Sequence, residues 1–266
     1  GASIAGRPIE FIQEDWEGGF TLVLPTPLKQ GERVTVEFDA AGDFLNGQSC
    51  DPTSVSGPAR APLGPTLEFA AARGSIDCYY PYTNGQWYPR HGYLARSTFE
   101  LSFLHPARYK IAGAGVRLKD NAPTGDKNVA ETVYQMTQPV ALVTFAMGPF
   151  KVYSEKFKLQ PAGEVPLELF SLGNIALKPD FMLAEMGNAL NYFGALFGPY
   201  PYPIFRAAYH PFGFGQGFAT MLVVPNIDSV SKETFRFLSH ETGHQWWGNI
   251  VGWRSYRDQW LSEGFA

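Results

Sequence analysis

The sequence predicts a protein of mixed α and β structure in two parts: an antiparallel β-sandwich over residues 1–173 and the first part of an α+β domain over residues 174–266. Two observations support this prediction. Short runs of alternating apolar residues, separated by Pro, Gly, Asn and Asp, dominate the chain as far as about residue 170. After Gly173 the apolar residues recur with the period of a helix. We therefore expect a domain boundary near residue 174.

Composition sets the first limits on function. The 266 residues are 45% hydrophobic and 17% charged, which allows a sizeable core and argues against disorder. There are 21 Lys and Arg residues against 25 Asp and Glu residues, with no block of like charge. We therefore expect no nucleic-acid partner and no polybasic contact with a membrane.

Four runs in the first part have the pattern of strands. Residues 20–24 are mostly apolar and stop at a proline, and residues 34–38 and 99–103 alternate apolar with polar side chains. Residues 140–147 are almost continuously apolar, which is typical of a strand buried on both faces. No sustained helical period occurs among these runs. Antiparallel pairing in a sandwich is therefore the expected arrangement.

The second part begins with a predicted helix. Apolar residues between 182 and 197 follow i, i+3, i+4, i+7 spacing, Pro179 suits the first turn, and Gly198-Pro199 is a stop signal. The uncharged stretch 186–205 has the length of a membrane span. It contains two asparagines and three prolines, whose polar groups lipid cannot satisfy. We expect a helix followed by a loop, and no transmembrane segment in this chain.

Two strands and two more helices follow. Residues 204–209 and 218–224 have the composition of strands. A helix should begin after Ser231, a suitable N-cap, and end at Gly248-Asn249. A last helix should begin at Ser255, where residues 255–258 have the form of a capping box, and run to the final residue.

The strongest chemical signal is His240-Glu241-Thr242-Gly243-His244. Residues four apart lie on one face of a helix, so the two imidazoles can bind the same metal ion. Glu241 lies beside them, where its carboxylate can reach a metal-bound water and accept its proton. Catalytic zinc takes three protein ligands and keeps one position for water, so a third ligand is required.

Glu263 is the candidate for that third ligand. Another class of zinc peptidase, the metzincins, would need a histidine at position 250, where the chain has Ile250. Eighteen residues separate His244 from Glu263 in the sequence. If the last helix packs antiparallel against the preceding one, its inward face carries this carboxylate to the two histidines.

These motifs resemble one family. The segments His240 to Asn249 and Trp260 to Ala266, with the spacing between them, are similar to the M1 family of zinc aminopeptidases, in the gluzincin clan. Trp87-Tyr88-Pro89, leading into the strand at residues 99–103, is similar to that family's aromatic-proline segment. The resemblance implies a saddle-like β-sandwich followed by a thermolysin-like catalytic domain. It also implies a peptide substrate.

The resemblance assigns roles to residues by their place in the motif. His240, His244 and Glu263 would bind zinc, and Glu241 would be the general base. The strand that runs along the substrate corresponds to Gly215, Gln216, Gly217 and Phe218, which we expect to bind substrate. In the family this strand carries a glutamate that binds the free amino group. Here no carboxylate occurs between residues 207 and 227, so Gln216 or backbone carbonyls would have to substitute.

Two alternatives therefore stay open beside the aminopeptidase. One is an M1-like endopeptidase or other hydrolase without the amine-binding acid. The other is a non-catalytic binding module with a vestigial metal site. The family's catalytic domain continues past the third ligand and supplies an oxyanion-stabilising tyrosine, whereas this chain stops three residues after Glu263. We therefore expect a fragment of a longer chain that lacks the remainder of the catalytic domain, and we expect the isolated chain to be inactive.

The remaining candidates have structural interpretations. His91, His105 and His210 lack partner spacing, and we expect Trp246 and Trp247 to lie in the core. Cys50 and Cys78 flank a loop-like stretch and are equally compatible with a disulfide and with two free thiols. The first residues lack the features of a signal peptide. Two cysteines do not fix the redox compartment, so the localisation stays open.

Overall fold

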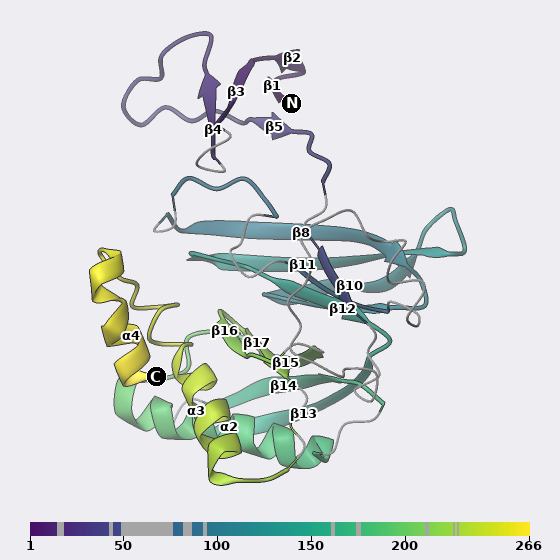
Figure 1. Cartoon of the computed structure of the whole chain (residues 1–266), viewed down its shortest axis with the longest axis vertical. Coiled ribbons are helices and arrows are strands. Elements are labelled where there is room, and N and C mark those ends of the chain that lie inside the picture. Colours follow the sequence, from purple (N-terminus) through teal and green to yellow (C-terminus); the bar gives the residue numbers. More distant parts are fainter. Residues whose placement is uncertain are drawn as a thin grey trace. The chain divides into compact units, whose positions relative to one another are not determined.

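Strands make up most of the regular secondary structure in the computed structural model (Figure 1). The structure describes the whole chain except residues 15–18, 43–44, 49–76, 82–86, 93–94, 161–162, 174–176, 211–212, 226 and 228. It divides into two compact units, Gly1–Phe44 and Leu45–Ala266. The expected domain boundary near residue 174 stays a prediction.

The first unit contains two small antiparallel sheets. One has the order β2-β1-β5 and the other pairs β3 with β4. The rings of Phe11 and Phe20 stack 5.1 Å apart, which joins β3 to β4. The strand predicted at residues 20–24 is confirmed, whereas only the last two residues of 34–38 form a strand. The bounds are β1 (Ala2–Ile4), β2 (Arg7–Pro8), β3 (Glu10–Glu14), β4 (Gly19–Val23) and β5 (Glu37–Phe38).

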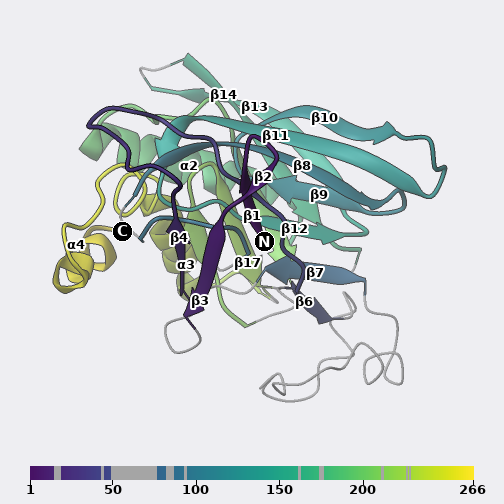
Figure 2. The same ribbon diagram turned by 90° about the horizontal axis from the view of Figure 1, so that it is seen from above.

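The second unit begins with two antiparallel sheets, as the β-sandwich prediction requires. The three-stranded sheet has the order β10-β11-β8, and its long strands lie side by side in Figure 2. The four-stranded sheet has the order β6-β7-β12-β9. Their bounds are β6 (Leu45–Gln48), β7 (Cys78–Pro81), β8 (Ser97–Pro106), β9 (Lys110–Gly113), β10 (Val116–Pro123), β11 (Val129–Val140) and β12 (Phe145–Gly148).

The prediction of one strand over residues 140–147 is wrong. Strand β11 ends at Val140 and β12 begins at Phe145. Val140 pairs with Ser97 of β8, whereas Phe145 pairs with Gly113 of β9, so the run passes from one sheet to the other. Val140, Val143 and Phe145 are all buried. The apolar run therefore reflects burial at a crossing between sheets and not a continuous strand.

A mixed five-stranded sheet and the helices make up the rest of the second unit. Its order is β13-β14-β15-β17-β16, and β15 pairs in parallel with both β14 and β17. Residues before and after position 174 therefore share one sheet. The two longest helices pack against it in Figure 1. The bounds are β13 (Lys151–Leu159), β14 (Gly163–Ser171), α2 (Pro179–Phe197), β15 (Phe205–His210), β16 (Gln216–Phe218), β17 (Met221–Pro225) and α3 (Lys232–Gly243).

Helix α2 confirms its prediction. It begins at Pro179, and Gly198 ends it with φ of +100°, a conformation that favours glycine. Its apolar stripe is buried at Met182, Met186 and Leu190. Among the described residues no helix combines the length and the apolar character needed to cross a membrane.

Helix α3 begins where the sequence predicted and ends earlier. The Ser231 hydroxyl accepts a hydrogen bond from the Thr234 N–H, and the Thr234 hydroxyl accepts one from the Ser231 N–H. The helix ends at Gly243 and not at residue 248, because tight turns follow it. In these turns the Gly248 N–H donates to the Val251 carbonyl, and Gly248 has φ of +101°. Histidine 244 is the C-cap residue.

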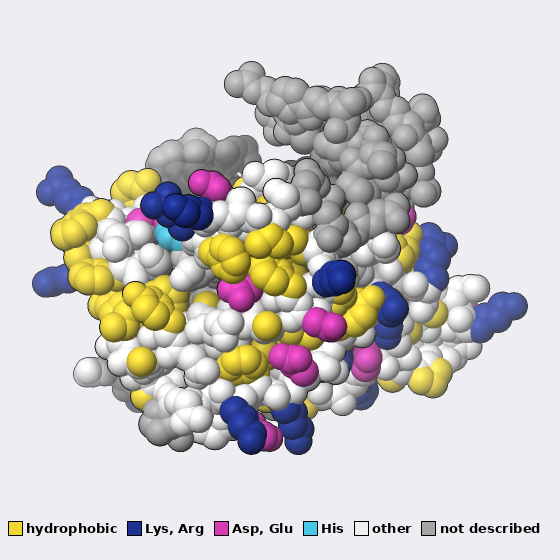
Figure 3. Space-filling model, turned by 90° about the horizontal axis from the view of Figure 1, so that it is seen from below, with side chains coloured by type: hydrophobic (Ala, Val, Ile, Leu, Met, Phe, Trp, Pro, Cys, Tyr) yellow, Lys and Arg dark blue, Asp and Glu magenta, His cyan; other side chains and the backbone are white. Residues whose placement is uncertain are grey.

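The last helix confirms its predicted start. The Asp258 carboxylate accepts hydrogen bonds from both the N–H and the hydroxyl of Ser255. A single 3-10 turn, η2 (Tyr256–Asp258), leads into α4 (Gln259–Phe265). Tyr256 and Trp260 are 71% and 68% exposed. Figure 3 shows hydrophobic side chains gathered at its left edge, the side on which α4 lies in Figure 1.

A buried arginine joins the mixed sheet to the sandwich strands. Arg206 of β15 is fully buried, and its Nε donates to Glu168 of β14 at 3.0 Å. Its Nη1 donates to the carbonyls of Gly113, the last residue of β9, and of Gly115, just before β10. Burying this charge is tolerable because the guanidinium has an ionic partner and several carbonyl acceptors. The contact fixes the sheet that carries the candidate site.

Of the two cysteines, only Cys78 lies among the described residues. It is 2% exposed and disulfide-bonded. Cys50 lies outside the described residues.

Candidate metal centre

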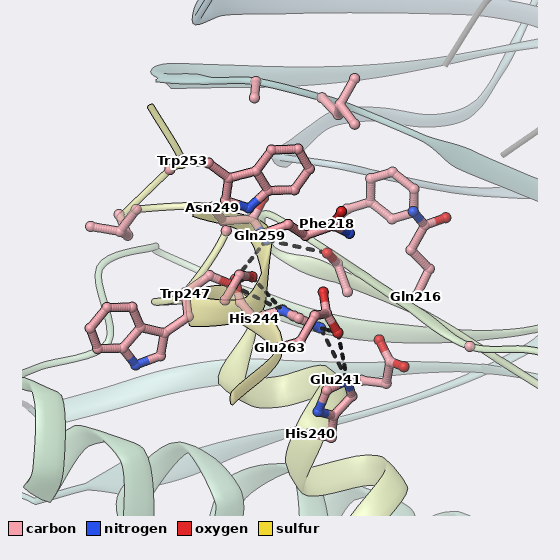
Figure 4. Close-up of a pocket in the computed structure, with 18 of the residues that line it drawn as sticks. Gln216, Phe218, His240, Glu241, His244, Trp247, Asn249, Trp253, Gln259 and Glu263 are labelled. Carbon is pink, nitrogen blue, oxygen red and sulfur yellow. Dashed lines mark hydrogen bonds and ion pairs between the residues drawn. The ribbon is translucent and has the colours of Figure 1, made fainter. Parts of the chain in front are cut away.

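Helix α3 carries two of the predicted ligands side by side. The Nε2 atoms of His240 and His244 lie 3.2 Å apart, one helical turn from each other, and their rings face the same side of the helix (Figure 4). His244 is largely buried, with a side-chain exposure of 14%, and His240 is more open at 36%. The His244 side chain is therefore largely enclosed by protein, whereas the His240 side chain is partly accessible to solvent.

Helix α4 delivers the third predicted ligand. Glu263 Oε2 lies 3.5 Å from His240 Nε2 and 3.7 Å from His244 Nε2. The three side chains offer ligand atoms that all lie within 4.8 Å of one another. Residues separated by eighteen others in the sequence therefore converge on one point, as the spacing predicted.

The far side of the His244 ring is fixed by a backbone carbonyl. Its Nδ1 donates to the Trp247 carbonyl at 3.0 Å, and the Ser262 hydroxyl donates to the same carbonyl at 3.2 Å. This contact places the ring proton on Nδ1, which leaves the Nε2 lone pair directed at Glu263 and His240. Burial lowers the pKa of His244, so the neutral ligand form is favoured. Two imidazoles and a carboxylate are a donor set that zinc binds.

Glu241 lies beside this group and is 6% exposed. Burial, together with the nearby Glu263 carboxylate, raises the pKa of its carboxyl to about 7, against the opposing effect of a hydrogen bond with the Gly217 backbone. A carboxyl with a pKa near neutrality is suited to exchange protons with a reacting group. Its side chain lies between the histidines and β16 in Figure 4.

Strand β16 forms one wall of the site through close backbone approach. A Cβ on Gly217 would lie 2.5 Å from the Glu241 carbonyl oxygen and 2.9 Å from the His244 Cβ. A Cβ on Gly215 would overlap the Phe237 ring. Glycine at these positions therefore allows β16 to lie directly against α3. Between them, the Gln216 Oε1 is buried without a hydrogen-bond partner among the described residues.

The prediction of a single strand over residues 218–224 is wrong, because a tight turn separates β16 from β17. Thr220 at this turn has φ of +68°, which is uncommon for a side chain branched at Cβ. Gln245, which is fully buried, holds both sides of the turn. Its Oε1 accepts from the Thr220 N–H and its Nε2 donates to the Phe218 carbonyl. The residue after His244 thus ties β16 to the end of α3.

These elements enclose a cavity of about 1240 Å³. The predicted ligands, Glu241 and residues 215–218 all line it, so the structure brings together every predicted site residue. Trp247 also lines it, whereas its neighbour Trp246 is 5% exposed in the core and donates to the Gly198 carbonyl.

Several residues that line the cavity were not predicted. They include Arg90, Arg96 and Trp253, and also Ser262, which supports His244. The only available signal was for Ser262, which precedes Glu263 within the motif. Arg96 is 153 residues from Asn249, whose carbonyl accepts its hydrogen bond, and no local pattern connects the two.

One of the histidines with an expected structural role also lies near the cavity. The His210 ring stacks on the Tyr80 ring with centroids 5.5 Å apart and an interplanar angle of 18°. It is hydrogen-bonded to the Phe214 backbone, and Phe214 lines the cavity. Burial lowers the pKa of His210 to about 4. His105, by contrast, bonds to Thr132 within the sandwich strands.

Two histidines one turn apart, the glutamate between them and a glutamate on a later helix match the residue pattern of the gluzincin class of zinc metallopeptidases. Comparisons with known proteins find the same resemblance: the peptidase family M1 domain matches residues 218–266. The M1 resemblance inferred from the motifs is thereby confirmed.

Two of the curated relatives are aminopeptidases by name. Glutamyl aminopeptidase of Sus scrofa is 27% identical over 187 residues, which are 64% of this chain and 19% of that protein. Aminopeptidase Q of Felis catus is 24% identical over 273 residues, covering 92% of this chain and 25% of that protein. This chain therefore spans about a fifth to a quarter of the length of these curated relatives.

The fold matches a solved structure over nearly the whole chain. The crystal structure of an M1 zinc metallopeptidase from Deinococcus radiodurans superposes with a TM-score of 0.74 at 21% sequence identity. The match covers 99% of this chain and 57% of the other. The prediction of a β-sandwich followed by the first part of a metallopeptidase domain is confirmed as a fold.

Proposed function

We propose that this protein is a zinc-dependent metallopeptidase of the M1 type that hydrolyses peptide bonds near the amino terminus of its substrate. The observation that carries the proposal is the convergence of three ligand atoms within 4.8 Å beside the buried Glu241. The names of the aminopeptidase relatives support the same activity.

His240, His244 and Glu263 would hold the zinc ion. Their donor set fits the ion, since two neutral imidazoles and one carboxylate leave part of its positive charge in place. When bound there, zinc polarises a substrate carbonyl and makes a water molecule acidic enough to be deprotonated near neutral pH. The Trp247 carbonyl keeps His244 in the orientation and tautomer that this binding needs.

Glu241 moves the proton. Its carboxylate accepts a proton from the attacking water and returns it to the nitrogen of the leaving group. The hydrogen bond with the Gly217 backbone keeps the carboxylate at the edge of the cavity. Glu241 is only 6% exposed, which limits the contact of its carboxylate with bulk water.

Residues 215–218 would bind the substrate along β16. Gln216 offers a buried carbonyl oxygen without a partner among the described residues, which suits it to accept a hydrogen bond from a substrate N–H or ammonium. It carries no negative charge, and no carboxylate occurs between residues 207 and 227. Because Gln216 is neutral, an endopeptidase or other hydrolase of the same type is the second candidate function.

The test of the catalytic role is Glu241→Gln, which keeps the shape of the side chain and removes its basicity. We expect the variant to retain one zinc per chain and to lose about a thousandfold in kcat. The matched control is Glu233→Gln, an exposed residue of the same helix that should leave kcat unchanged. Activity that survives in the Glu241 variant at full zinc content would overturn the proposal.

Free and N-acetylated peptides separate the two candidate specificities. An aminopeptidase should lose nearly all turnover on the blocked peptide, whereas an endopeptidase should cleave both. A wild-type protein that binds zinc and cleaves neither would instead be a binding module with a vestigial site.

A further inference from the structure

The charges around the cavity are divided in an uneven way. Among the described residues that line it, the carboxylates are those of Glu241 and Glu263, which both belong to the candidate metal centre. The guanidinium groups among these described residues are those of Arg90 and Arg96, which come from a different part of the chain, between β7 and β8. The basic side chains therefore lie in the cavity apart from the acidic pair.

Arg96 is held in place at the cavity wall. Its Nη1 donates to the Asn249 carbonyl, and a Cβ on Gly252 would lie 2.7 Å from its Nη2. Asn249 is itself fixed, because its Nδ2 donates to the carbonyls of His244 and Gly217. The guanidinium is therefore positioned relative to both the second histidine and β16.

Much of the hydrogen-bonding capacity of Arg96 is available to a ligand. A guanidinium has five donors in a fixed fork, and one of them binds Asn249. Among the described residues no carboxylate forms an ion pair with Arg96. A guanidinium binds a carboxylate through two parallel hydrogen bonds, so a carboxylate is the ligand that suits Arg96 best.

We propose that Arg96, with Arg90, forms a subsite for a carboxylate of the substrate, so that this cavity selects peptides bearing a negative charge. The proposal rests on the proposed peptidase function and deepens it, since it names the substrate class of that same cavity. A carboxylate can come from an Asp or Glu side chain or from the carboxyl terminus of a short peptide. Both offer the same two oxygens to the guanidinium.

The experiment measures peptide binding, so that it gives a result even if no peptide is cleaved. In the zinc-loaded Glu241→Gln protein, calorimetry compares tetra-alanine amide with peptides in which one alanine is Glu or Gln, at each position in turn. A further arm uses tetra-alanine with a free carboxyl terminus. We expect one Glu position, or the free acid, to bind about tenfold more tightly than its uncharged counterpart.

The variants assign that difference to the arginines. Arg96→Gln and Arg90→Gln, each added to the Glu241→Gln background, should bring charged and uncharged peptides to equal affinity. Arg96→Lys should restore part of the difference, because it keeps the charge without the fork. The matched control is Arg254→Gln, an exposed arginine of the same segment as Gly252 that does not line the cavity.

Two results would overturn the proposal. One is equal affinity for charged and uncharged peptides before the arginines are changed. The other is a preference for the charged peptides that persists when both arginines are replaced. Whether the side-chain arm or the terminal arm carries the preference identifies the source of the carboxylate. Failure of peptide hydrolysis would leave these comparisons intact, so the two proposals fail separately.

Discussion

His244 donates its Nδ1 proton to the backbone carbonyl of Trp247 at 3.0 Å, three residues further along the chain. This bond leaves Nε2 as the nitrogen with the lone pair and directs it at the other two candidate ligands. The turn that ends α3 therefore prepares a histidine on that helix for metal binding. A helix that continued to residue 248 would place the Trp247 N–H and carbonyl in the helical ladder, away from the ring.

Ser262 gives the first prediction. Its hydroxyl donates to the Trp247 carbonyl at 3.2 Å and lies 3.4 Å from His244 Nδ1. Ser262→Ala should weaken zinc binding about tenfold, because the ring and its carbonyl partner lose their support. Competition with a chelator measures this affinity. Ser102→Ala, which removes an exposed hydroxyl bonded to Glu131, serves as the control and should bind zinc as the wild type does. Unchanged affinity in Ser262→Ala would show that Trp247 alone fixes His244.

Gly217 gives the second prediction. Gly217→Ala places a methyl group 2.5 Å from the Glu241 carbonyl oxygen, so β16 and α3 must separate. We expect a loss of about 2 kcal/mol in the free energy of unfolding and a loss of peptidase activity. Denaturant titration and kinetic assays measure the two effects.

Gly194→Ala is the matched control for this substitution. Gly194 lies within α2, and a Cβ there meets nothing within 4 Å. Alanine is the better helix former, so this variant should gain about 0.5–1 kcal/mol in stability. A Gly217→Ala protein as stable and active as the wild type would contradict the close packing of β16 on α3.

His210 gives a prediction about pH. Its pKa is about 4 in the folded protein and 6.5 when it is unperturbed. Between pH 6.5 and 4 the unfolded chain binds a proton that the folded protein does not. Stability should therefore fall as the pH falls through this window, by roughly 3 kcal/mol from this residue, and the contribution is complete above pH 6.5.

The variant His210→Phe tests this assignment. Phenylalanine keeps an aromatic ring against Tyr80 and Phe214 and does not titrate. The free energy of unfolding of the variant should decline less steeply between pH 6.5 and 4 than that of the wild type. The exposed His91→Phe variant should follow the wild type. Parallel pH profiles for His210→Phe and the wild type would mean that other groups cause the acid loss.

Local sequence was sufficient to place the candidate metal ligands on their helices. His240 and His244 are four apart on a helix whose N-cap could also be recognised, and Glu263 follows a recognisable capping box at Ser255. Each of these features depends on neighbours within a few residues. The convergence of the three side chains then follows from the packing of two short helices.

Tertiary contacts determined the strand breaks and the cavity residue that local sequence did not predict. The break at Thr220 depends on Gln245, 25 residues away, which holds both sides of the turn. The break after Val140 depends on two different partner strands, β8 and β9. The sequence does not show this break, because a run of apolar residues has the same pattern whether it lies in one sheet or crosses between two. Arg96 reaches the cavity through a contact with Asn249 that has no local signal.

The most direct test of the account is an anomalous diffraction map at the zinc edge from crystals of the zinc-loaded protein. We predict one strong peak about 2 Å from Nε2 of His240, from Nε2 of His244 and from a carboxylate oxygen of Glu263. A fully loaded protein whose zinc peak lies away from these three side chains would contradict the central claim.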